Sequence, residues 1–285
     1  MSNFLRALRG ELYLFSRRRS IFRLHLGVFF FSALLVVVNY LNLQAFALAN
    51  DSQLIQLSGN NFWPQWSSAL YTSLYLVELA VVLILSGMLP HEVSIGAVRD
   101  TISRQLSRTN FMLARILLSA ILPLSLYFFA ALGAASVSYS LFDPGDIMED
   151  GEVILSFYDD GVGAALFQSV IHGILPLMTL GVVATACGAF FKRQVLALGV
   201  CLIFVLLPTM LKESFGELLP YYFSDFLPAF GPDSFLSRSS QFSAGFSDAY
   251  PYEYDQIARI GWWSSLPYLF CAIIVGCLSF KKRAL

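Results

Sequence analysis

The sequence predicts an all-α integral membrane protein in which residues 1–285 form a single domain with six transmembrane helices. Hydrophobic residues make up 57% of the chain and charged residues only 13%, whereas soluble domains carry about 25% charged residues. Six apolar stretches reach or approach the length of about 20 helical residues that crosses a hydrocarbon core. These predicted spans are Leu24–Leu43, Trp66–Leu89, Leu113–Phe142, Val162–Phe190, Val195–Leu211 and Trp263–Phe280.

The distribution of basic residues predicts the orientation of these spans. Most of the 18 Lys and Arg residues lie in the N-terminal segment, between spans two and three, between spans four and five, or after span six. The other side holds Lys212, Arg238 and Arg259, together with an acidic loop after span three. The positive-inside rule therefore predicts that both termini are cytoplasmic. We expect a multi-pass protein of the cell inner (cytoplasmic) membrane, with a solvated acidic loop outside rather than a Ca²⁺ site.

The first segment, residues 1–23, is basic and has helical periodicity. Phe4, Leu5, Leu8, Leu12 and Phe15 form one apolar stripe, which predicts an amphipathic helix lying in the cytoplasmic interface. A frayed basic anchor is the alternative, and it would not require the stripe. The apolar run that follows is too long for the h-region of a signal peptide, so we expect an uncleaved first span.

A charged, helix-patterned region, residues 91–112, separates spans two and three. Its apolar residues Ile95, Val98, Ile102 and Leu106 fall on one stripe of a helix, and its charged residues fall outside that stripe. Two interpretations remain open. The helix docks on a soluble partner, or it lies on lipid headgroups.

The loop before the last span, residues 212–262, is predicted to lie outside and is unusually long. Span five ends at Pro208, which also leaves open a broken or re-entrant continuation. The loop is rich in proline, which tends to end helices. Short helices or a lid over the pathway are one interpretation, and an interfacial aromatic belt is the other. The candidate outer-gate residues are Tyr221, Tyr222, Phe223, Phe226 and Phe230.

Signatures of catalytic chemistry are absent from the sequence. There is no phosphate-binding loop, zinc-protease motif or nucleophile elbow, so we expect a chain that is not an enzyme and that has no metal, cofactor or nucleic-acid partner. The four cysteines are predicted to be buried apolar residues. Glu78 lies in the middle of a span, where a carboxylate usually faces protein or a cavity. Glu78 and His172 are the pathway candidates. A structural hydrogen bond to another span is nevertheless favoured for Glu78, and hydrogen-bonded packing is favoured for His172.

The segment Glu92-x-x-x-Gly96-Ala97-Val98-Arg99, followed by Ser107-Arg108 and by Ala114-Arg115 at the start of span three, resembles the signature of type-2 ATP-binding-cassette (ABC) exporter permeases. Ala97 stands where that family usually has threonine, and Gln105-Leu106 stands where it usually has a proline and the residue after it. By this resemblance the region forms a coupling helix that docks on a cytosolic ATPase. The residues that would form or support the contact are Glu92, Ile95, Gly96, Arg99, Arg104 and Arg108.

The resemblance further implies a permease subunit that exports its substrate. Two copies, or this chain and a related permease, would enclose the pathway, and the ATP and Mg would be bound by the partner ATPase. A non-transporting membrane scaffold or assembly subunit, an ion-coupled carrier and a membrane-embedded enzyme are the alternatives. Neither the residues nor the resemblance specifies the substrate.

Overall fold

The chain folds into a bundle of long helices. The computed structural model describes residues 3–48, 61–99, 107–149, 152–156, 161–215, 222–231, 234–244 and 254–282. Among these residues, six helices are long and apolar enough to cross a membrane. They are α2 (Arg19–Leu48), α4 (Phe62–Ser94), α6 (Arg108–Leu141), α7 (Val162–Phe190), α8 (Gln194–Phe215) and α10 (Tyr254–Lys282). Each coincides with one predicted span, except that Phe142, the predicted end of span three, lies just after α6. The prediction of a multi-pass helical membrane protein is confirmed.

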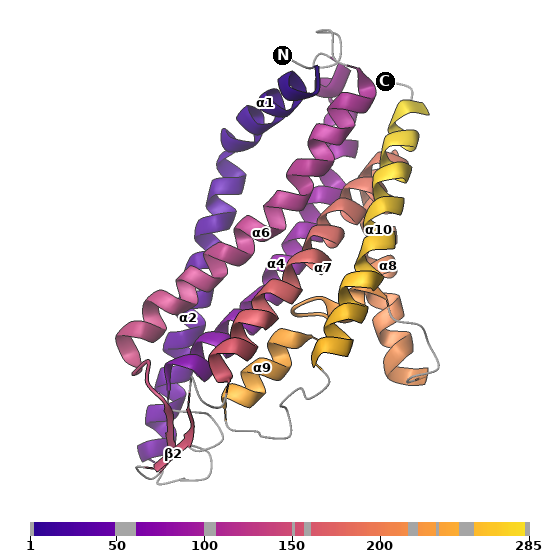
Figure 1. The fold of residues 1–285 in the computed structure, drawn as a ribbon. Coiled ribbons are helices and arrows are strands. Elements are labelled where there is room, and N and C mark those ends of the chain that lie inside the picture. Colours follow the sequence, from indigo (N-terminus) through magenta and orange to yellow (C-terminus); the bar gives the residue numbers. More distant parts are fainter. Residues whose placement is uncertain are drawn as a thin grey trace.

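The two ends of the bundle differ in what they carry. Helix α1 (Asn3–Ser16) and the last turn of α10 lie at the same end of the bundle, and we call this the terminal end (Figure 1). The opposite end carries α9 (Phe235–Ser243) and a hairpin of β1 (Ile147–Glu149) and β2 (Glu152–Leu155). The antiparallel hairpin follows the third span and was not predicted from the sequence.

Helix α7 is central to the packing, since it contacts α4, α6, α8 and α10. Small residues allow these helices to approach closely, as is usual between membrane helices. A Cβ atom on Gly181 of α7 would collide with the Ser119 carbonyl oxygen of α6. A Cβ atom on Gly133 of α6 would likewise collide with the Phe29 carbonyl oxygen of α2. Replacing either glycine would therefore push two helices apart.

The loop before the last span is shorter than predicted. Helix α8 continues through Pro208 to Phe215, and α10 already begins at Tyr254. A break at Pro208 is therefore not observed, because a proline inside a membrane helix is tolerated when its neighbours compensate. Between the two helices the chain forms a short 3-10 helix, η2 (Phe223–Phe226), and then α9. These elements confirm the prediction of short helical pieces in this region.

The orientation of the bundle gives the first testable prediction. In a variant whose native cysteines are replaced by alanine, a cysteine at the exposed Gln241 of α9 should react with a membrane-impermeant thiol reagent added to intact cells. A cysteine at the exposed Ser94, at the terminal end of α4, should react only after permeabilisation. The expectation follows from the excess of basic residues at the terminal end. Labelling of Ser94→Cys in intact cells would reverse the orientation.

Candidate functional site

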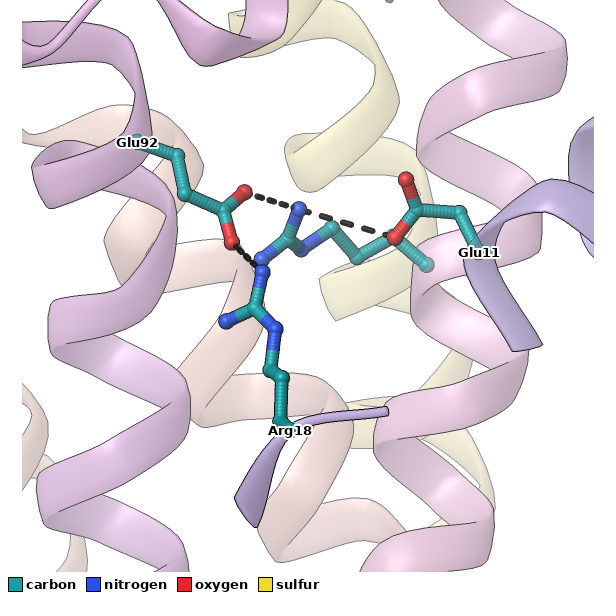
Figure 2. Close-up of polar contacts among 4 residues, drawn as sticks. Glu11, Arg18 and Glu92 are labelled. Carbon is teal, nitrogen blue, oxygen red and sulfur yellow. Dashed lines mark hydrogen bonds and ion pairs between the residues drawn. The ribbon is translucent and has the colours of Figure 1, made fainter. Parts of the chain in front are cut away.

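Two guanidinium and two carboxylate groups meet at the terminal end, where the sequence predicted a docking region. Glu92, near the end of α4, pairs through one oxygen with Arg18, in the turn between α1 and α2, and through the other with Arg115 of α6. Glu11 of α1 lies 3.6 Å from Nη1 of the same Arg115. Figure 2 shows how the labelled Glu92, Arg18 and Glu11 converge. We call these four residues the Glu92 cluster.

The Glu92 cluster is mostly shielded from solvent. The side chain of Arg115 is 7% exposed and that of Arg18 is 34% exposed. Burial raises the pKa of the Glu11 carboxyl above its ordinary value, although the Arg115 charge opposes this shift. Buried charges are retained when they are paired and hydrogen-bonded. The cluster therefore holds α1, α4, α6 and the α1–α2 turn together through Glu92 and Arg115.

The chain changes direction immediately after Glu92. Ile95 caps the C-terminus of α4, and Gly96 has φ +78°, a conformation that is strained for residues with a Cβ atom. Helical geometry resumes at Ala97. Ile95 is 63% exposed, whereas Val98 is 2% exposed. The prediction that Ile95 and Val98 share one stripe is therefore wrong, because the turn at Gly96 interrupts the helical phase. Ile102 and Leu106 lie outside the described residues.

The predicted docking residues fall into inward-facing and outward-facing groups. Glu92 faces inward as described above, while Ile95 and Arg99 are exposed. A Cβ atom on Gly96 would have open space around it, so a partner could approach the backbone at this turn. Arg108, in the first turn of α6, donates from Nη1 to the Lys281 carbonyl oxygen of α10 at 3.2 Å. Arg104 lies outside the described residues.

An open cavity of about 480 Å³ lies beside this turn. Its lining includes the charged residues Glu11, Arg18 and Glu92 and the apolar residues Ile95 and Val98. The cavity places charged groups of the Glu92 cluster next to the exposed apolar turn.

A second polar site lies within the bundle, at Glu78. Its side chain is fully buried in the middle of α4. One carboxylate oxygen accepts a hydrogen bond from the Ala229 backbone N–H at 2.8 Å, and the other accepts from the Phe230 N–H at 3.0 Å. The partner is thus a loop rather than another span. Buried backbone groups need hydrogen-bond partners. The Glu78 carboxylate is the acceptor for the backbone N–H groups of Ala229 and Phe230, which lie outside any α-helix.

The segment that Glu78 holds, residues 222–231, is buried between helices, and we call it the buried loop. Its 3-10 helix η2 packs against α7, α8 and α10. Asp225 accepts hydrogen bonds from the Tyr222 N–H at 2.9 Å and from Lys212 Nζ at 3.4 Å. The non-helical backbone at this depth is therefore surrounded by protein, as a membrane interior requires.

The aromatic residues of the buried loop pack inside the protein. Phe223 and Phe226 are both buried, and Phe230 contacts the ring of Tyr75 edge to face, with 5.4 Å between ring centroids. The aromatic-belt interpretation is therefore wrong for Phe223 and Phe226, because protein rather than the membrane interface surrounds them. Tyr222 is half-buried, and Tyr221 lies outside the described residues.

His172 of α7 has the packing environment that the sequence favoured. Its Nδ1 accepts a hydrogen bond from Trp262 Nε1 at 2.8 Å, and its ring also contacts Phe235. Within the described ranges, no group of three or more His, Cys, Asp or Glu residues is placed to hold a metal ion.

No family model matches this sequence. No curated protein matches it either. The resemblance to type-2 ABC permeases therefore rests on the segment from Glu92 to Arg115 and on the arrangement of spans.

Sequence reasoning missed the partners of Glu92. Arg115 was treated as a basic residue that opens span three, and Arg18 as one member of a basic segment. One signal was present, because Glu11 is the single acidic residue within residues 1–23. A single acid in a basic, apolar-striped helix indicates an ion pair, and the structure shows this pair with Arg115 of α6. The sequence contained no comparable signal for the contact between Glu78 and the buried loop.

Proposed function

We propose that this chain is the membrane-spanning permease subunit of an ATP-driven ABC exporter and that a separate cytosolic ATPase drives it. The observation that supports the proposal is the geometry around the Glu92–Arg99 motif. The motif lies at the terminal end, between α4 and α6, where the chain turns at Gly96 and exposes Ile95 and Arg99. A docking element must present such residues while its base stays fixed to the spans.

The Glu92 cluster supplies that fixed base. A displacement of the turn at Gly96 moves α4 directly, because the turn follows α4 in the chain. The ion pairs of Glu92 transmit this displacement to α6 and to the α1–α2 turn. In the proposed cycle, ATP binding closes two ATPase subunits and moves the docked turns, so that the spans rock between inward-open and outward-open arrangements. Two copies of this chain, or this chain and a related permease, enclose the pathway, and ATP and Mg stay on the ATPase.

The proposal places the terminal end in the cytoplasm and α1 in the cytoplasmic interface of the inner membrane. Helix α1 supports this placement because one face contacts α6 while Leu5, Leu12 and Tyr13 are exposed. Exposed apolar side chains beside the exposed Arg6 and Arg9 suit a helix that lies at the level of lipid headgroups.

A charge reversal tests the docking role. Arg99→Glu should weaken co-purification of the ATPase about tenfold or more and lower its stimulation, because a like-charge contact in an interface costs several kcal/mol. Arg9→Glu is the matched control, since it makes the same charge change on the exposed face of α1. Equal ATPase association in wild type and Arg99→Glu would contradict docking at this turn.

The transport assay separates the proposal from its alternatives. Export in proteoliposomes that contain both subunits should stop when ATP is omitted. Transport that continues on an ion gradient alone would indicate an ion-coupled carrier. A stable complex that moves no substrate would indicate a scaffold.

A further inference from the structure

A second cavity, of about 310 Å³, opens at the terminal end between α4 and the first residues of α2 and α8, and we call it the lateral cavity. Its lining divides by chemistry. Most of its apolar residues come from α4, and we call them the wall; we call the residues whose side chains can donate hydrogen bonds the rim. The main residues are Leu83, Ile84 and Met88 in the wall and Arg18, His91 and Gln194 in the rim.

The rim has the charge and the donors that suit an anion. Arg18 is the charged residue of the lining, and no carboxylate lines the cavity among the described residues. Arg18 uses Nη2 to bind Glu92, and a guanidinium has five N–H donors. Ser20 and Gln194 lie in the first turns of α2 and α8 and also line the cavity. The first N–H groups of a helix have no partner within it and carry partial positive charge.

A small soluble anion would fit the lateral cavity poorly, because it would not cover the apolar wall. Leu83 is exposed on α4, and Ile84 and Met88 are half-buried beside it. A phosphate ion would satisfy the rim but leave this wall uncovered. A molecule with an anionic head and a hydrocarbon chain would cover both parts. The cavity lies at the end of the span, where headgroups meet hydrocarbon, and basic pockets between membrane helices at the cytoplasmic side bind anionic lipid headgroups.

We propose that the lateral cavity binds one phospholipid with an anionic headgroup. The lipid phosphate accepts hydrogen bonds from Arg18, His91 and Gln194, and one acyl chain lies along Leu83 and Met88. The site shares Arg18, Ser20 and His91 with the cavity beside the turn at Gly96. Lipid binding there needs neither an ATPase nor a transported substrate, so the proposal stands independently of the transport function. Because Arg18 also belongs to the Glu92 cluster, the bound lipid stabilises the α1–α2 turn.

Lipid retention by the detergent-purified chain tests the site. Native mass spectrometry after addition of phosphatidylglycerol or phosphatidylcholine should show one tightly retained phosphatidylglycerol and no retained phosphatidylcholine. Met88→Trp fills the cavity and should weaken phosphatidylglycerol retention about tenfold. Leu79→Trp is the matched control, because Leu79 is exposed on the same helix but does not line the cavity. Equal loss in both variants would overturn the proposal in favour of general lipid contact.

A charge variant and a probe without acyl chains complete the test. Gln194→Glu keeps the shape of the side chain but adds a negative charge at the rim, and it should also weaken phosphatidylglycerol retention about tenfold. Phosphatidylglycerol should raise the melting temperature, whereas inorganic phosphate at the same concentration should not. Equal protection by phosphate would make this a site for free anions and would overturn the lipid assignment, as would undiminished retention in Gln194→Glu.

Discussion

Replacing Glu78 with leucine is expected to leave the backbone N–H groups of Ala229 and Phe230 buried without acceptors. Each unsatisfied buried donor costs about 1–3 kcal/mol, so the variant should lose about 2–6 kcal/mol of stability. Glu78→Gln should lose roughly half as much, because its amide keeps one acceptor and turns a second donor toward an N–H group. The melting temperature of the detergent-purified protein measures both effects.

Sequence alone suggests that glutamine is a mild replacement at Glu78, because it keeps two hydrogen-bonding ends. The structure changes this expectation, since both oxygens accept. Leu79→Gln is the control, as it introduces the same amide on the exposed face of α4 and should change the melting temperature little. Wild-type stability of Glu78→Gln together with loss of transport would contradict the structural role and indicate that the carboxyl takes part in transport.

Breaking the Glu92 cluster is expected to have an effect of similar size at the terminal end. Glu92→Gln removes the closer of the two carboxylates that neutralise the buried Arg115, the other being Glu11. Breaking a buried ion pair in this way costs about 3–5 kcal/mol. Arg18→Gln should cost about 1 kcal/mol or less, because the Arg18 side chain is one-third exposed and water screens its pair. Chemical unfolding of the single variants gives this ranking.

A double-mutant cycle shows whether Glu92 and Arg115 act as a pair. Glu92→Gln combined with Arg115→Gln should cost about 0.5–3 kcal/mol less than the sum of the two single changes, because residues in contact are not additive. Glu92→Gln combined with Arg9→Gln is the control and should be additive, since Arg9 is exposed on α1 and outside the cluster. Additivity in the first cycle would show that the pair contributes no coupling.

The parts of the fold that depend on local composition could be predicted. Each span was found because about 20 apolar residues in sequence suffice to define it, and the short helices after α8 followed from the spacing of prolines. Glu78 was singled out because a carboxylate in a span must be satisfied by protein or water. These inferences use properties of neighbouring residues only.

The contacts that depend on tertiary structure could not be predicted. Glu78 is satisfied by a loop that lies far away in sequence, and nothing in its own span identifies that partner. Phe223 and Phe226 look like interfacial aromatics because burial inside a protein and burial in an interface select the same residue types. The prediction that Ile95 and Val98 share one stripe was wrong because Gly96, with its positive φ, interrupts the helix between them. Hydrophobic periodicity alone cannot detect such a turn.

The contact between Glu78 and the buried loop also sets an order of events during biosynthesis. Ala229 follows Glu78 by 151 residues, and ribosomes add roughly 5–20 residues per second. Helix α4 therefore emerges about 8–30 s before its partner exists. During this interval the carboxyl group must be hydrated or shielded by the insertion machinery. Substitutions in the buried loop should consequently be detected first by cellular quality control, as degradation of an incompletely assembled chain.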